Sequence, residues 1–276
     1  MNDPSSNVES HYGRGRVLAT VLEALKAAGK DLDRLTTLDL APVDEFHVRG
    51  REATLDLARL VDIPKGRRVL DVGCGLGGSA RFLASEFHCD VTGVDLTQEY
   101  VDAAARLATL VGLGDRVTFR RADAISLPFD DASFDLVWTE HVQMNIGAKA
   151  RFYGEIARVL RPGGTLLFHD IFQGEGGPPH FPVPWAEEAS ISHLVSPAEA
   201  RREIESVGLK VAVWLDRGEA ARAWFEAATA RLEAQGPPPL GIHLLLGPTA
   251  RTKLQNVARN LSERRIAVVQ AVAKRG

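Results

Sequence analysis

The sequence predicts an α/β protein whose central sheet is mostly parallel and carries helices on both faces. Between residues 65 and 170, short apolar runs of strand length alternate with stretches of helical length that are rich in alanine and leucine. A glycine-rich turn at 73–78 joins the first apolar run to the first such helix. Parallel strands need long crossover connections, which are usually helical, so this alternation indicates a parallel sheet covered on both sides.

Each element of this core has a local signal. The helix expected over 149–160 ends at Arg161-Pro162-Gly163-Gly164, a stop that combines a proline with two glycines. The fourth strand follows the turn-forming residues Asp130, Asp131 and Ser133. We therefore expect strands at 68–72, 90–95, 117–121, 134–138 and 165–169, with helices at 78–87, 98–111 and 149–160.

Segments of another character surround the core, and we expect them to complete a single domain over residues 1–276. Residues 11–60 have the pattern of a helical N-terminal segment. Residues 172–197 are rich in glycine and proline and predict a long lid loop, because long ordered loops are uncommon unless they cover a site. Residues 218–262 predict a helical cap, with helices at 218–234 and 249–262, and residues 265–273 predict a last strand.

Composition excludes several classes of protein. The chain of 276 residues has 33 basic and 36 acidic residues, a net charge of −3, so we expect neither nucleic acid nor a membrane as a partner. The N-terminal stretch has no apolar core of a signal peptide, and no apolar run approaches the about 20 residues of a membrane helix. Two cysteines and no metal-ligand cluster favour a cytoplasmic protein without a disulfide framework or a metal.

The glycine turn has the spacing GxGxxG, which alone is a weak signal for a dinucleotide site. Asp71 lies two residues before the first glycine, where a dinucleotide would place its pyrophosphate, and a carboxylate there would repel it. An aspartate suits a positively charged ligand better, such as S-adenosylmethionine, and Asp95 at the end of the next strand could bind its ribose. A nicotinamide or flavin site, or a tight turn with a capping aspartate, remains an alternative.

Five segments, in order and at similar spacing, resemble the class I S-adenosylmethionine-dependent methyltransferases: DVGCGLGG, VTGVDLT, RADAISLPF, FDLVWTEHV and VLRPGGTLLFHD. The resemblance implies a Rossmann-like fold, with a seven-stranded sheet, an antiparallel last strand and a cofactor-binding core over 65–170. It also implies S-adenosylmethionine as methyl donor and S-adenosylhomocysteine as product. It places the methionine half against Asp71, Gly73, Gly75 and Thr139, the ribose on Asp95, and the adenine beside Leu96, Asp123 and Ala124.

The flanking segments DEFHVRG and PPHFPVPWAEEASISHLVSP are similar to sarcosine/dimethylglycine N-methyltransferases. The region also resembles ubiquinone/menaquinone C-methyltransferases and sugar O-methyltransferases, which carry a similar His-x-x-Gly near the cofactor; here that pair is His47 and Gly50. These relatives differ in acceptor, so the likeness does not name a substrate. We expect a small-molecule acceptor, with N- or O-methylation favoured, and a monomer or homodimer. Methylation at carbon of a quinone or isoprenoid-like acceptor is an alternative, as are a nicotinamide-dependent oxidoreductase and a cofactor-binding protein without catalysis.

Two polar residues are candidates for catalysis. His141 follows the fourth strand and Asp170 ends the fifth, so the two side chains are expected on the same edge of the sheet. A neutral histidine can take a hydroxyl proton and a carboxylate can orient its ring. The alternative is that both are structural and that catalysis rests on positioning alone.

Other side chains have open roles. His47, expected on an N-terminal helix, could close over the cofactor or take part in local packing. Trp185, Phe181 and Phe172 could form a partial cage for a cationic amine or pack as an apolar lid.

Overall fold

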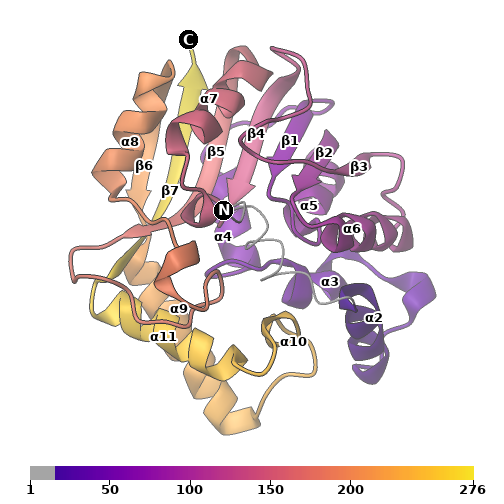
Figure 1. Cartoon of the computed structure of the whole chain (residues 1–276). Coiled ribbons are helices and arrows are strands. Elements are labelled where there is room, and N and C mark those ends of the chain that lie inside the picture. Colours follow the sequence, from indigo (N-terminus) through magenta and orange to yellow (C-terminus); the bar gives the residue numbers. More distant parts are fainter. Residues whose placement is uncertain (1–15) are drawn as a thin grey trace.

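The computed structural model describes residues 16–276, so residues 11–15 of the expected N-terminal segment lie outside the described residues. Its core is a seven-stranded sheet in the order β3-β2-β1-β4-β5-β7-β6 (Figure 1). β7 is antiparallel to both of its neighbours, whereas the other pairs are parallel, which confirms the predicted sheet. The strands are β1 (Arg68–Val72), β2 (Asp90–Asp95), β3 (Val117–Arg121), β4 (Phe134–Glu140), β5 (Leu160–Gln173), β6 (Leu209–Asp216) and β7 (Ile266–Arg275).

The helices of the core begin and end within a residue or so of the sequence expectation. Two elements, α8 and β6, were not expected from the sequence. The start of α8 does have a local signal, since Ser196 and Glu199 form a capping box and Pro197 is its first residue. The α-helices are α2 (Val17–Ala27), α3 (Thr37–Asp44), α4 (Arg51–Ala58), α5 (Gly78–Phe87), α6 (Gln98–Leu110), α7 (Lys149–Val159), α8 (Pro197–Ser206), α9 (Gly218–Gln235), α10 (His243–Leu246) and α11 (Ala250–Ser262). Three short 3₁₀ helices are η1 (Leu32–Arg34), η2 (Gln143–Asn145) and η3 (Ala189–Ile191).

Alternating side chains divide the buried core between the two faces of the sheet. Leu70 of β1 belongs to the cluster formed with α7 and α8, whereas its neighbour Val69 packs with α4 and α5. Leu166 and Leu167 of β5 divide in the same way. Successive strand residues point to opposite faces, so an uninterrupted apolar strand can fill both layers at once.

The remaining helices gather at the end of the sheet toward which β4 points (Figure 1). On one side α2 and α3 pack against α6 and the α10 region in a shared apolar cluster. The buried ion pair between Asp44 of α3 and Arg81 of α5 joins this segment to the core. On the other side α9 and α11 pack with the loop that follows β5. The two groups of helices together form a cap over the carboxyl ends of the parallel strands.

The lid loop begins later than expected, because β5 continues to Gln173. The middle of this loop, at residues 180–182, then contacts α11. The backbone amide of His180 donates to Asn260 (2.7 Å), and the side chain of Asn256 donates to the Pro182 carbonyl (2.8 Å). Within the described chain, no helix is both long and apolar enough to span a membrane.

One expectation about the loop is wrong. Phe172 lies in β5 and packs in the core against Phe168 and Trp214, with ring centroids 6.1 and 6.0 Å away. It therefore cannot contribute to an aromatic cage with Trp185. Alternation along β5 turns its side chain toward the α7 and α8 layer.

Candidate functional site

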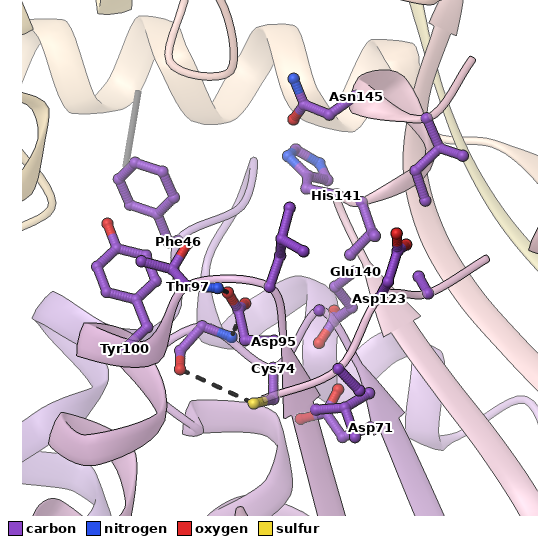
Figure 2. Close-up of a pocket in the computed structure, with 18 of the residues that line it drawn as sticks. Phe46, Asp71, Cys74, Asp95, Thr97, Tyr100, Asp123, Glu140, His141 and Asn145 are labelled. Atoms are coloured by element: carbon purple, nitrogen blue, oxygen red, sulfur yellow. Dashed lines mark hydrogen bonds between the residues drawn. The ribbon is translucent and has the colours of Figure 1, made fainter. Parts of the chain in front are cut away.

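A cavity of about 510 Å³ opens at the carboxyl ends of β1, β2 and β4, beneath the cap (Figure 2). Its size falls in the usual range for small-molecule sites. It is lined by every site residue expected from the sequence except Thr139 and Asp170: His47, Asp71, Gly73, Gly75, Asp95, Leu96, Asp123, Ala124 and His141. Among residues 16–276, no group of His, Cys, Asp and Glu side chains is arranged to hold a metal ion.

The glycine turn forms the floor of the cavity. The amides of Gly73 and Cys74 both donate to the Val94 carbonyl, at 2.8 and 2.9 Å, which fixes the turn against β2. Gly73 and Gly75 have φ of 71° and 52°, in the left-handed region that favours glycine. A Cβ on Gly73 would lie 2.2 Å from Cγ2 of Val142, whereas a Cβ on Gly75 would meet nothing within 4 Å.

Asp71 is a buried carboxylate with one unused oxygen. It is 2% exposed, and no hydrogen-bond partner reaches its Oδ2 among the described residues. Burial, and then the nearby carboxylates Glu140 and Asp95, raise the pKa of Asp71 well above its usual value. An unpaired buried oxygen among like charges is costly, so this position favours a donor that carries positive charge.

Asp95 holds the glycine turn and the start of the next helix. Its Oδ2 accepts from the Gly75 amide (3.0 Å) and its Oδ1 from the Thr97 amide (2.9 Å). Asp95 also lines the cavity. Asp123 also faces the cavity, and its Oδ1 accepts from the Ile125 amide (3.0 Å).

Glu140, the last residue of β4, has polar partners from several parts of the chain. Its Oε2 accepts from Ser79 Oγ (2.5 Å) and from Trp138 Nε1 (2.8 Å), and its Oε1 lies 3.4 Å from His47 Nε2. His47 lies in the turn between α3 and α4, which corrects its expected place on a helix. Since Nε2 of His47 is 3.0 Å from the Gly50 carbonyl, which can only accept, this nitrogen carries a proton.

His141 lies directly after β4 in a conformation that non-glycine residues seldom adopt, with φ of 53°. Its Nε2 is buried and has no partner among the described residues. The ring centroid of His169 is 5.0 Å away and that of His47 is 5.9 Å away. Burial, and then these two histidines, lower the pKa of His141 well below its usual value, so its ring is neutral near pH 7.

Asp170 lies on the opposite side of β5 from His169. It is within the strand instead of at its end, and its carboxylate accepts from the amides of Val142, Gln143 and Ile171 at 3.1, 3.1 and 2.8 Å. Burial raises the pKa of Asp170 to about 6. These bonds fix the turn that carries His141, and no bond joins the two side chains among the described residues.

Thr139 is a second expected residue outside the cavity lining. It lies within β4 and is 1% exposed, and its hydroxyl has no partner among the described residues. Among the lining residues that were not expected as site residues are Phe46, Asn145 and His193. Each comes from a loop or a short helix and reaches the cavity only through tertiary packing.

Comparison with known families assigns the core around this cavity. A family described as methyltransferase domain matches residues 70–168, the segment that carries Asp71, Asp95, Asp123 and His141. The matched residues are similar to this methyltransferase family. The match covers β1 through most of β5, so the matched segment supplies the floor of the cavity and the flanking segments supply the cap.

Individual relatives extend the likeness beyond the methyltransferase domain. A dimethylglycine N-methyltransferase of Parasynechococcus marenigrum is 33% identical over 171 residues, which are 62% of this chain and 60% of that protein. The chain spans about half the length of the curated relatives it matches.

Solved structures share the fold over nearly the whole chain. A geranyl diphosphate C-methyltransferase from Streptomyces coelicolor A3(2), solved with Mg²⁺, geranyl diphosphate and S-adenosyl-L-homocysteine, has a TM-score of 0.72 at 18% identity and covers 100% of this chain and 98% of its own. The [4+2]-cyclase SpnF has a TM-score of 0.69 at 23% identity, covering 99% and 97%. One of these folds carries the name of a different reaction, so function has to be argued from the site.

The two glycines of the turn separate backbone strain from steric overlap. We expect Gly75→Ala to destabilise the protein by about 1–2 kcal/mol, the cost of the left-handed conformation alone. Gly73→Ala adds overlap with Val142 and should cost about 1–3 kcal/mol more. Urea unfolding of both variants measures the difference.

The control is a double-mutant cycle. Val142→Ala alone removes two methyl groups, and in the double variant it should recover part of the loss caused by Gly73→Ala but none of the loss caused by Gly75→Ala. Equal losses at the two glycines, or no coupling of Gly73 to Val142, would contradict the close approach of the turn to this side chain.

Proposed function

We propose that this protein is an S-adenosylmethionine-dependent methyltransferase that acts on a small-molecule acceptor and releases S-adenosylhomocysteine. The observation that carries the proposal is the unused Oδ2 of Asp71, buried at the floor of the cavity beside two more carboxylates. The donor has an ammonium group and a sulfonium, and both charges are favourable in such a site. A pyrophosphate would instead add negative charge to it.

The other cavity residues fit the remaining parts of the donor. Asp71 would accept from the ammonium, with the backbone of Gly73 and Gly75 against the methionine part. Asp95 would accept from the ribose hydroxyls, since it ends β2 and lines the cavity. Leu96 and Ala124 offer apolar contact to adenine and Asp123 offers an acceptor to its amino group. Thr139 is buried outside the lining and would support the floor without touching the donor. His47 lines the cavity and would contact the donor, with its Nε2 held by the Gly50 carbonyl.

The chemistry of transfer assigns different roles to the expected catalytic pair. When bound, the donor supplies a methyl group on sulfur that leaves its electron pair behind as the acceptor attacks. His141 would take the proton that an acceptor hydroxyl loses as its bond to the methyl group forms, because the ring is neutral and its Nε2 is unengaged. Asp170 would be a positioning residue, holding the turn of Val142 and Gln143. Most of the acceleration would come from positioning and from the exclusion of water under the cap.

The charge argument is tested by separating the two ends of the donor. We expect Asp71→Asn to weaken S-adenosylmethionine binding by about 1.5–3 kcal/mol, the usual loss for a hydrogen bond to a charged group, and to leave adenosine binding unchanged. Asp95→Asn should weaken both ligands, since both carry the ribose. Calorimetric titration of each ligand into each variant gives the four affinities. Unchanged S-adenosylmethionine affinity in Asp71→Asn would contradict the assignment of Asp71.

The catalytic role of His141 is tested by turnover, using an acceptor found with a tritium-transfer screen. His141→Ala should lower kcat by about 10²–10⁴-fold, the usual range for general base catalysis, and leave the Kd of S-adenosylhomocysteine within about twofold. Because the pKa of His141 is lowered, the wild-type rate should not fall as pH decreases from about 8 to 6.5. Asp170→Asn should lower kcat and the free energy of unfolding together. A loss below about threefold in His141→Ala would leave positioning as the mechanism.

A further inference from the structure

A second, smaller cavity adjoins the first at the two histidines. It measures about 40 Å³ and shares Phe46, His47 and His141 with the main cavity. We call it the annex. Its other walls come from η2, β5, the lid loop and the cap: Val48, Met144, Ile171, Pro184, Trp185, Trp224, Phe225, Ile242, Leu254 and Val257. Since one water needs about 10–15 Å³ of such space, the annex has room for about three water-sized groups.

The walls of the annex are apolar and aromatic. Apart from its two histidines, no polar side chain of the described residues lines it. Trp185 is buried and its indole nitrogen donates to Ser192 (3.0 Å), so its polar atom is already satisfied. A space of this kind favours a small hydrocarbon group and disfavours a charge.

The carboxylates of the main cavity are either bound to other residues or lie away from the annex. Of its carboxylates, Asp44 is paired with Arg81 and Glu140 accepts from Ser79 and Trp138. The others lie on the floor, where the proposed donor binds (Figure 2). The end of the cavity near the annex is formed by His141, Asn145 and His193, none of them acidic.

Within the described part of the chain, no lysine or arginine side chain lines either cavity. Lys149 lies near this end but its ammonium group is buried and donates to the carbonyls of Gln143, Ile146 and His193. Arg49 is bound to Asp56 (2.8 Å). An acceptor with a carboxylate or a phosphate would therefore lose its hydration without gaining a cationic partner.

We infer that the methyl acceptor is an uncharged hydroxyl compound whose small apolar substituent occupies the annex, an inference that rests on the proposed methyltransferase function. The hydroxyl lies at His141, between the annex and the donor. The acceptor oxygen forms the new bond to the methyl carbon while the carbon–sulfur bond breaks, and the sulfur keeps the electron pair. The hydroxyl proton passes to the imidazole of His141 and then to water, so the products are a methyl ether and S-adenosylhomocysteine.

The test compares two probes of the same shape that differ in charge. 4-Isopropylphenol and 4-hydroxybenzoate each carry a three-atom group, branched in one and planar in the other, opposite a phenolic hydroxyl. N,N-dimethylglycine is added as a second compound with a carboxylate. Each is titrated by calorimetry into the full chain saturated with S-adenosylhomocysteine. We expect the neutral phenol to bind at least about tenfold more tightly than either carboxylate, because only it avoids an unpaired buried charge.

Variants of α11 locate the binding. Leu254→Trp fills the annex and should weaken 4-isopropylphenol at least about tenfold, with the Kd of S-adenosylhomocysteine within about twofold. Gln255→Trp adds the same side chain to the exposed side of the helix and should change neither affinity.

The outcomes distinguish a failure of the proposed function from a failure of the acceptor inference. Failure of S-adenosylhomocysteine to bind would overturn the proposed function and this inference with it. If S-adenosylhomocysteine binds, three results overturn the acceptor inference alone. A carboxylate probe binds as tightly as the phenol or more tightly, the phenol does not bind, or Leu254→Trp has no effect on phenol binding.

Discussion

Three carboxylates crowd the end of the sheet, and the arrangement of the site depends on how their repulsion is offset. Asp71, Asp95 and Glu140 come from β1, β2 and β4, which are neighbouring strands about 5 Å apart. Backbone amides bind Asp95, and Ser79 and Trp138 bind Glu140. Asp71 alone retains a buried oxygen without a partner among the described residues. This oxygen is buried at the floor of the cavity, where a positively charged group would offset the repulsion among the three carboxylates.

The cap is joined to the core through the same groups. His47 reaches Glu140 from the turn after α3, and Arg81 of α5 pairs with Asp44 at the end of α3. The lid loop is held by Asn256 and Asn260 of α11, so it forms one wall with that helix. The same elements line the annex.

The local sequence was sufficient to predict which residues form the floor of the site. The residues above the floor are placed by tertiary packing. Asp71 and Asp95 were predictable because each follows a short apolar run at a strand end, where the chain itself fixes the position. His169 and Asp170 are adjacent in a strand, so only one of the two side chains can face His141. The pairing of β5 with β4 sets the register that places His169 there, and this pairing cannot be predicted from the local sequence. His193 and Trp185 reach the cavities through a loop whose path depends on α11.

The most direct measurement of the central claim is a calorimetric comparison of S-adenosylhomocysteine and NAD⁺ on the wild-type chain. Both carry adenosine, but one presents an ammonium and the other a pyrophosphate to Asp71. We expect S-adenosylhomocysteine to bind one equivalent at least about 100-fold more tightly than NAD⁺, a difference of about 2.7 kcal/mol. NAD⁺ binding as tightly as S-adenosylhomocysteine would contradict the claim that the carboxylates at this end of the sheet select a cationic ligand.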